Sequence, residues 1–309
     1  MKAGPGHRPT KKSCWPVLLA GLLILILSAC RPDRSATLAL LGDINLGRGV
    51  NPSAGSFSIL AKDLAEADLA MANLESPLSA NPPTSLTGYN LCAPQERAGL
   101  LSKWGLDLLS LANNHRLDCN PQGNTETSSI LETGGIAPIG PGMEPVYRTV
   151  NGLRLAFLAF DDVTSGLEVE MALQAIRSAR DSQALVIVSI HWGMEYQSGT
   201  SERQEWLARQ FSQAGASLVW GHHPHVLQPA EWIDTDPGKT LVLYSLGNAL
   251  FDQPGLADTR ESALALVRLG PQGVQSLLAV PFMIDPVKSS LVKPDDQTAR
   301  RILDTLKIK

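Results

Sequence analysis

The chain has 309 residues, of which 44% are hydrophobic and 18% charged. This composition is typical of a globular protein with one large α/β domain or two small ones, and it excludes a repeat array, a coiled coil and a long disordered tract. The formal net charge is −4, and without the N-terminal segment described next 22 Lys and Arg face 30 Asp and Glu, a net charge of −8. Such an acidic chain argues against a nucleic-acid partner.

Residues 1–29 have the pattern of a lipoprotein signal peptide. A basic stretch precedes the apolar run "PVLLAGLLILIL" (16–27), which is too short for a comfortable membrane span. The run ends in "LSAC" (27–30), which resembles a bacterial lipobox and implies cleavage before Cys30 and lipidation of its thiol. An uncleaved N-terminal anchor is the alternative. In both cases we expect an extracytoplasmic domain attached to the cell membrane, with residues 30–36 as a short tether.

Apolar runs and helical patterns alternate from residue 36 onward. The apolar runs predict buried strands at 36–41, 68–72, 106–112, 153–160, 184–190 and 216–220. The helical patterns lie at 56–67, 93–105, 124–135 and 201–215, the last opening on a Ser and closing on a Gly. This alternation predicts a mostly parallel sheet with helices packed on its faces.

The pattern changes after residue 240. Apolar runs at 240–246, 262–269 and 274–284 follow one another with only turns between them, which predicts antiparallel pairing. The stretch "DDQTARRILDTLKI" predicts a terminal helix. We therefore expect one domain over residues 37–284 and a C-terminal tail with a helix over residues 285–309.

Polar side chains follow five of the predicted strands. In open α/β sheets the site lies beyond the carboxyl ends of the strands, so these endings are expected to meet. Five of the six histidines fall in them. Carboxylate, amide and imidazole donors without cysteine suit Mn²⁺, Fe²⁺ or Zn²⁺, and there are enough donors for two divalent ions. Scattered helix caps and core histidines are the alternative interpretation. The endings are "GDIN" (42–45), "NLE" (73–75), "NNH" (113–115), "HWGME" (191–195) and "GHHPH" (221–225).

Six motifs in order carry a family resemblance. They are "GDINLGR", "NLESPL", "SLANNHRLD", "HWGMEY", "GHHPHVLQP" and "YSLGNALFDQ". From about residue 37 to 255 the chain resembles the bacterial capsule-synthesis CapA family of poly-γ-glutamate synthesis, which is itself similar to the calcineurin-like metallophosphoesterases. The resemblance implies an α/β, layered metallophosphoesterase-like fold with a central β-sandwich flanked by helices.

The resemblance also implies a dinuclear metal site. Asp43 and His225 would bind one ion, Asn114, His191 and His223 would surround the other, and Glu75 would lie between the two. Asn45 stands where the phosphoesterases carry a histidine, and an amide is a poorer ligand. His115 would be the general acid that protonates the leaving group, while water activated by the ions attacks a phosphoryl or acyl centre.

Further residues would surround this site. Arg48 would clamp an anionic group of the substrate, although an arginine that opens a loop is also often just solvated. Glu195 would bind substrate or orient His191. Supporting positions behind the ligands are His222, Asn248 and Asp252.

Two cysteines, Cys92 and Cys119, remain if Cys14 leaves with the signal and Cys30 carries lipid. An oxidising compartment permits a disulfide between them, and two buried thiols are the alternative. The chain departs from the family at Cys119 and Asn120, where the family tends to have an aromatic residue and a glycine, and at Ala249, where an aromatic residue is usual.

Two hypotheses of function follow. The first is a lipid-anchored hydrolase with two metal ions that acts on a phosphoester or amide of an envelope polymer, a polyprenyl-linked intermediate or polyglutamate. The second is a non-catalytic, metal-containing subunit that binds or exports an anionic polymer for a membrane synthase. A general acid beside a metal ligand favours the enzyme, since a binding module has no use for one.

Overall fold

In the computed structural model, the described residues are 1, 34–83, 89–236, 238–253 and 255–308. The expected signal peptide, Cys30 and most of the expected tether lie outside them. Residues Ser35–Lys309 form one compact unit. None of the helices in the described ranges is long and apolar enough to cross a membrane.

The larger of two main sheets is built around strand β1 (Ala36–Ile44). Parallel strands lie on one side of β1 and antiparallel strands on the other, while β13 pairs with the end of β1. Across the described residues, the order is β16 (Ser290–Val292), β15 (Gly273–Asp285), β14 (Glu261–Gly270), β1, β2 (Leu69–Leu74), β5 (Leu108–Ser110) and β6 (Ala137–Ile139), with β13 (Asn248–Leu250) off this path.

The second main sheet has a parallel centre and an antiparallel strand at each edge. Its order in the described chain is β11 (Leu227–Thr235), β12 (Gly238–Leu246), β10 (Ala216–His222), β9 (Leu185–His191), β8 (Leu153–Asp161) and β7 (Gly142–Val150). A short ladder of β3 (Leu78–Ser79) and β4 (Ala93–Pro94) lies apart from both sheets. The predicted antiparallel pairing after residue 240 is confirmed for β14 and β15, whereas the run at 240–246 is β12, which lies in the second sheet and pairs antiparallel with β11.

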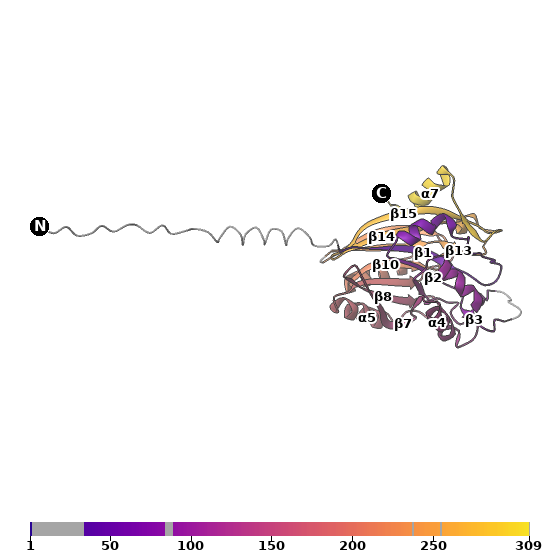
Figure 1. Cartoon of the computed structure of the whole chain (residues 1–309), viewed down its shortest axis with the longest axis horizontal. Helices are drawn as coiled ribbons and strands as arrows, with labels where there is room; N and C mark the ends of the chain where they lie inside the picture. Colours follow the sequence, from indigo (N-terminus) through magenta and orange to yellow (C-terminus); the bar gives the residue numbers. More distant parts are fainter. Residues whose placement is uncertain (2–33, 84–88, 237, 254, 309) are drawn as a thin grey trace. The chain divides into compact units, whose positions relative to one another are not determined.

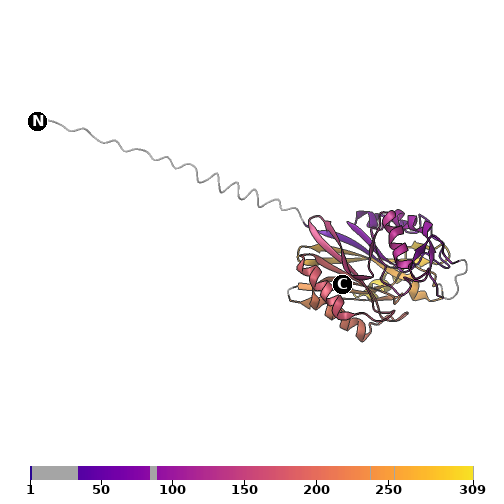
Figure 2. The ribbon, with the colours of Figure 1, turned by 90° about the horizontal axis from the view of Figure 1, so that it is seen from below.

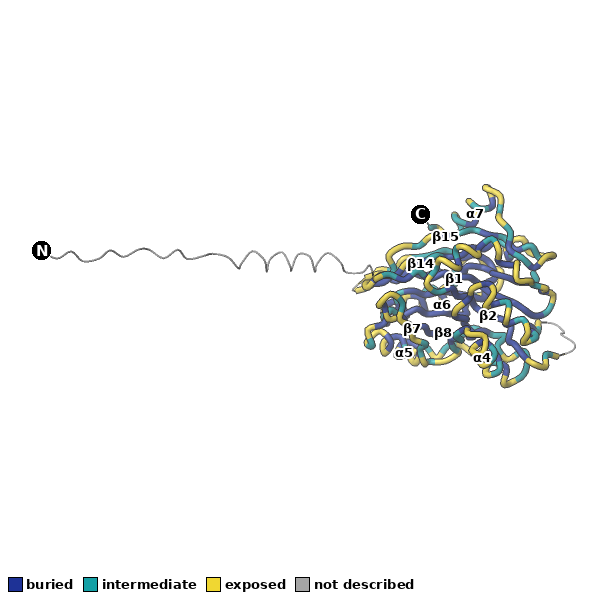
Figure 3. Tube along the Cα trace, in the orientation of Figure 1, coloured by how far each residue is buried: buried dark blue, intermediate teal, exposed yellow. Residues whose placement is uncertain are grey.

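The two sheets pack face to face, and strand β1 shows why. Successive side chains of a strand point to opposite faces. Leu38 and Leu40 of β1 enter the core between the sheets together with Phe157 of β8 and Trp220 of β10. Leu41 of β1 enters the other core, against the helices of its own sheet. The buried strands in the centre of the unit are visible in Figure 3.

Helices cover the outer face of each sheet. Leu64, Leu101 and Leu131 come from the helices on the first sheet, and Ile176 and Phe211 from those on the second. Figure 2 shows the two groups on opposite sides of the strands, and Figure 1 gives the labels of the elements. The first group is α2 (Ala61–Glu66), α3 (Ala98–Lys103) and α4 (Gly123–Thr133), and the second is α5 (Val169–Asp181) and α6 (Glu202–Ala214), with short 3-10 turns at Ser58–Leu60, Gln95–Arg97 and Ala257–Arg260.

The predicted fold class, a layered α/β fold with a central β-sandwich flanked by helices, is confirmed. The predicted helix at 201–215 is α6, with a capping box between Ser201 and Gln204 and a left-handed Gly215 at its end. Residues 285–309, expected as a tail, contribute β16 and helix α7 (Asp296–Leu306) to the unit. The sequence did not predict helix α5 or several strands, namely β3, β4, β6, β7, β11, β13 and β16.

Candidate metal centre

Strand register brings the predicted site residues to one edge of the unit. In the first sheet Asp43 lies opposite Asn73 of β2 and Asn248 of β13. In the second sheet His222 lies opposite His191. Parallel neighbours in register end at the same level, so the carboxyl ends of β1, β2, β9 and β10 deliver their polar residues together.

Glu75 lies at the centre of the cluster. Its Oε1 lies 3.6 Å from His225 Nε2, 3.8 Å from His115 Nε2 and 4.0 Å from His191 Nε2. The residue is 0% exposed, and neither carboxylate oxygen has a hydrogen-bond partner among the described residues. A buried carboxylate without partners is costly unless a positive charge faces it.

Asp43 is equally buried but is held by the protein. Asn73 Nδ2 donates to its Oδ1 at 2.8 Å, and the amide of His223 donates to its Oδ2 at 3.2 Å. His222 Nδ1 and His225 Nδ1 each lie 3.5 Å from an Asp43 oxygen. Asp43 therefore connects the first sheet to the histidine loop of the second.

The loop after β10 holds two histidines in a strained backbone. His223 has φ 95° and His225 has φ 58°, a region that residues with a Cβ seldom adopt. The ring of His223 lies 4.7 Å from that of His191 and 6.0 Å from that of His225, measured between centroids. The strain thus turns both imidazoles toward the same space as His191.

Asn248 fixes the orientation of His225. His225 Nδ1 donates to Asn248 Oδ1 at 2.8 Å, and Asn248 Nδ2 donates to the carbonyl of Thr259 at 3.0 Å. With Nδ1 engaged in this way, the lone pair of Nε2 faces Glu75. This is the supporting role predicted for Asn248, and it is the usual arrangement behind a metal-binding histidine.

The protonation states fit a metal ion. Burial lowers the pKa of His222 and His225 to about 3 and lowers the pKa of His191 and His223, so their imidazoles are neutral and offer lone pairs. Burial raises the pKa of Asp43 to about 7, and burial together with the Asp43 charge raises the pKa of Glu75. A divalent cation would supply the positive charge that these carboxylates lack.

Two groups of side chains in the described residues have ligand atoms within 4.8 Å of one another. One is Asp43, Glu75 and His191, and the other is Glu195, His223 and His225. Asn114, a predicted ligand, lies beside the first group, with its Oδ1 2.9 Å from His191 Nε2. This grouping differs from the predicted one in two respects. His191 lies with Asp43 and Glu75, and Glu195, which was expected to bind substrate or orient His191, lies with His223 and His225.

Asn45 and Arg48 both form hydrogen bonds to Asp252. Asn45 Oδ1 accepts the amide of Gly47 at 2.7 Å and its Nδ2 donates to Asp252 at 3.0 Å, so the side chain also supports the loop after β1. Arg48 donates to both oxygens of Asp252. Asp252 is thus a supporting residue, and it already neutralises the charge that was expected to bind substrate.

Three residues near the site had no predicted role. Asn73 holds Asp43, and Asn113 Nδ2 donates to Asn73 Oδ1 at 3.3 Å and to the Leu74 carbonyl at 2.9 Å. Asp118 Oδ2 lies 2.8 Å from His115 Nδ1. The sequence carried a signal for each of them. Asn73 and Asn113 stand at predicted strand ends, and Asp118 follows His115 after only two intervening residues.

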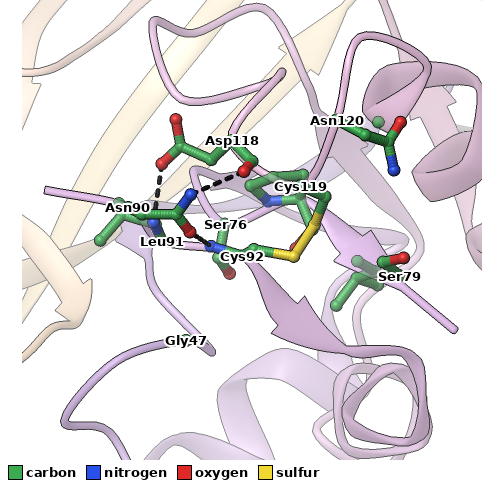
Figure 4. The surroundings of a disulfide bond; sticks show 12 residues. Gly47, Ser76, Ser79, Asn90, Leu91, Cys92, Asp118, Cys119 and Asn120 are labelled. Atoms are coloured by element: carbon green, nitrogen blue, oxygen red, sulfur yellow. Dashed lines mark hydrogen bonds between the residues drawn. A yellow bond between two sulfur atoms is a disulfide. The ribbon is translucent and has the colours of Figure 1, made fainter. Parts of the chain in front are cut away.

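His222 and the two cysteines complete the surroundings. Both nitrogens of the buried His222 are without a hydrogen-bond partner, and its ring packs edge-on against Trp220 at 4.3 Å. Cys92 and Cys119, left open by the sequence, are joined by a disulfide (Figure 4).

The layered sheets form a metallophosphoesterase-like fold, with a cluster of histidine and carboxylate side chains at their common edge. A hypothetical protein from Thermus thermophilus has a similar fold, with a TM-score of 0.52 at 17% identity, covering 80% of this chain and 99% of that one. The family model for the bacterial capsule synthesis protein PGA_cap matches residues 37–253. The chain belongs to this family, which confirms the predicted resemblance.

Named relatives agree with this assignment. The capsule biosynthesis protein CapA of Bacillus anthracis is 31% identical over 301 residues, which cover 85% of this chain and 72% of the relative. The PGA biosynthesis protein CapA of Bacillus subtilis is 30% identical over 302 residues, which cover 89% of this chain and 78% of the relative. A probable polyglutamine synthesis accessory protein of Mycobacterium tuberculosis is 26% identical over 178 residues, 48% of this chain and 46% of the relative.

Proposed function

We propose that the protein is an extracytoplasmic, lipid-anchored hydrolase of capsule or poly-γ-glutamate biosynthesis that uses two divalent metal ions to cleave a phosphoester or amide bond. The observation that carries the proposal is Glu75, a fully buried carboxylate without a hydrogen bond among three imidazoles. The names of the Bacillus relatives supply the biosynthetic context.

In such a reaction the carboxylates, the imidazoles and His115 would have different roles. Bound ions would polarise the scissile group and lower the pKa of water. Glu75 and Asp43 balance the charge, and His191, His223 and His225 hold neutral nitrogens toward the same space. The side chain of His115 is 15% exposed, so its ring contacts the buried cluster and is also partly accessible to solvent.

His115 is the proposed general acid. Its Nδ1 donates to Asp118, which leaves Nε2 directed at the cluster, 3.8 Å from Glu75 Oε1. In the imidazolium form His115 carries a proton on each ring nitrogen, and the Nε2 proton could pass to the leaving oxygen or nitrogen of a substrate held there. The ring would then be neutral and keep its remaining proton on Nδ1, bound to Asp118. The expected substrate is an anionic polymer or a lipid-linked intermediate, consistent with an anchored protein and a membrane synthase as partner.

The test combines metal content with turnover. The full chain is compared with Glu75→Gln, and Glu261→Gln is the control, because Glu261 pairs with Arg301 of α7 and is not one of the cluster. Mass spectrometry should find about two Mn, Fe or Zn ions per parent chain. Phosphoesters and γ-glutamyl amides are then screened, and Glu75→Gln should lower both metal content and kcat/KM by at least about tenfold.

Two results would contradict the proposal. A parent chain that carries no metal after reconstitution with Mn²⁺, Fe²⁺ and Zn²⁺ rules out the metal centre. A metal-loaded parent that hydrolyses nothing, yet retains an anionic polymer in a Glu75-dependent way, would instead identify a non-catalytic polymer-binding subunit.

A further inference from the structure

The segment Asn90–Cys92 lies between two loops of the candidate metal centre. On one side the Leu91 carbonyl contacts Gly47, where an added Cβ would lie 2.2 Å from the Leu91 oxygen. On the other side the Leu91 amide donates to Asp118 Oδ2 at 2.6 Å (Figure 4). The segment therefore touches the loop after β1 and the loop that carries His115.

The same oxygen of Asp118 holds His115. Asp118 Oδ2 accepts from His115 Nδ1 at 2.8 Å, and the Asp118 amide donates to the His115 carbonyl at 2.9 Å, which closes a tight turn. The His115 amide donates to Asn113 Oδ1 at 3.1 Å. The direction in which His115 Nε2 points thus depends on where Asp118 lies.

A further hydrogen bond and the disulfide connect the Asn90–Cys92 segment to Asp118 and its neighbour. Asn90 Nδ2 donates to the Asp118 carbonyl at 2.6 Å, and within the segment the Asn90 side-chain oxygen accepts the Cys92 amide at 2.9 Å. The disulfide then joins Cys92 to Cys119, the residue next to Asp118. Figure 4 shows the hydrogen bonds and the disulfide side by side.

The disulfide is the covalent part of this connection. It joins residues 27 apart in sequence, and Cys92 is 0% exposed. Without it, the segment and the His115 loop would be held by hydrogen bonds alone, and the chain between them would regain conformational freedom.

We propose that Asp118 is a positioning residue for His115 and that the Cys92–Cys119 disulfide keeps Asp118 in place. The effect on catalysis rests on the proposed hydrolase function, whereas the placement of the imidazole ring does not. A thiol reductant that cleaves the Cys92–Cys119 disulfide would therefore weaken proton donation to the leaving group more than it weakens metal binding.

The first measurement is leaving-group dependence in the metal-loaded full chain. The variants are Asp118→Ala, Asp118→Asn and the double variant Cys92→Ser, Cys119→Ser. A positioned general acid contributes about 10²–10⁴-fold to rate, and aryl phosphates need it least because their leaving groups are stable anions. Asp118→Ala and the double variant should therefore lose at least about tenfold more kcat on an alkyl than on an aryl phosphoester. Asp118→Asn keeps an acceptor oxygen and should restore part of the loss.

Glu126→Gln is the matched control. Glu126 accepts hydrogen bonds from Ser79 and Ala80, which lie between β2 and the Asn90–Cys92 segment. It also accepts one from Asn120, which follows Cys119. It makes no contact with His115 among the described hydrogen bonds and ion pairs. The ratio of alkyl to aryl rates should be unchanged in this variant. Equal losses on both substrates in Asp118→Ala would overturn the positioning role.

The second measurement is independent of turnover. Long-range ¹H–¹⁵N spectra of the full chain with Zn²⁺ report which nitrogen carries the proton in the neutral ring of His115, the form that remains after proton donation. We expect Nδ1–H in the parent and in Glu126→Gln, and a shift toward Nε2–H in Asp118→Ala and the double serine variant. An unchanged tautomer in Asp118→Ala would refute the proposal. If the parent hydrolyses no substrate, the proposed function fails and these spectra alone decide the placement of His115.

Discussion

At the scale of single residues, amide side chains hold the charged and imidazole groups of the metal centre in place. Asn73 donates to Asp43, Asn113 donates to Asn73, and Asn248 accepts from His225. An amide can donate and accept hydrogen bonds without bringing a further charge next to a divalent ion. The candidate ligands are therefore oriented by neutral groups, and the negative charge of the site comes from the carboxylates of Asp43, Glu75 and Glu195.

Substitutions of two asparagines test whether amide side chains orient the candidate metal ligands. Asn248→Ala removes the acceptor that orients His225, so we expect metal affinity to fall by about 10–100-fold. Asn45→Ala removes only hydrogen bonds to Gly47 and Asp252 and should keep its metal. Titration of both full-length variants with Zn²⁺ measures the difference. A loss of affinity in Asn45→Ala as large as that in Asn248→Ala would place Asn45 in the ligand set.

At the scale of elements, the residues after Asp285 add a strand and a helix to the β-sandwich. Strand β16 pairs antiparallel with β15. Helix α7 begins at the Asp295 cap, whose side chain accepts the amide of Thr298, and it buries Ile302 and Leu306 in the core between the two sheets. In Figure 1 α7 lies over β15. The helix is thus packed against the sandwich.

A substitution in α7 measures how much this packing contributes. Ile302 is 0% exposed, so Ile302→Ala should lower the free energy of unfolding by about 2–5 kcal/mol. Arg300→Ala, an exposed change on the same helix, should alter it by no more than about 0.5 kcal/mol. Urea denaturation followed by circular dichroism gives both values. Equal and small effects would mean that α7 adds little to the stability of the fold.

Strand endings were predictable from the sequence, and side-chain orientation in the loops was not. Apolar runs identify strands, and parallel strands carry whatever follows them to the same edge, so Asp43, Glu75, His191, His223 and His225 could be placed together. The turn of Asn45 toward Asp252 and of Asp118 toward His115 depends on local hydrogen bonds that no periodicity records. Strand β7 was missed because its residues are mostly half-exposed or exposed and give no apolar run.

At the scale of the whole molecule, the proposed anchor sets where the protein works. The expected lipidation site, Cys30, lies shortly before the first strand, which begins at Ala36. A lipid on that cysteine would keep the domain within a few residues of the membrane surface. This location suits a substrate that is itself lipid-linked or is made by a membrane synthase.

Lipidation is tested by intact mass in a bacterial host. The parent should lose residues 1–29 and gain the mass of its acyl groups, whereas Cys30→Ser should show neither change. Cys14→Ser, inside the expected signal, should yield a mature protein identical to the parent. An identical mass for the parent and Cys30→Ser would exclude the lipid anchor.

The division of the ligands between the two sheets has a mechanical consequence. Asp43 lies in β1 and Glu75 directly follows β2 of one sheet, while His191 lies in β9 and His223 and His225 follow β10 of the other. A divalent ion coordinated by both sets would cross-link the layers at one end of the sandwich, in addition to the apolar core between them. Sliding of one sheet against the other would then break metal–ligand bonds, so the bound cation would resist shear between the layers as well as serve the chemistry.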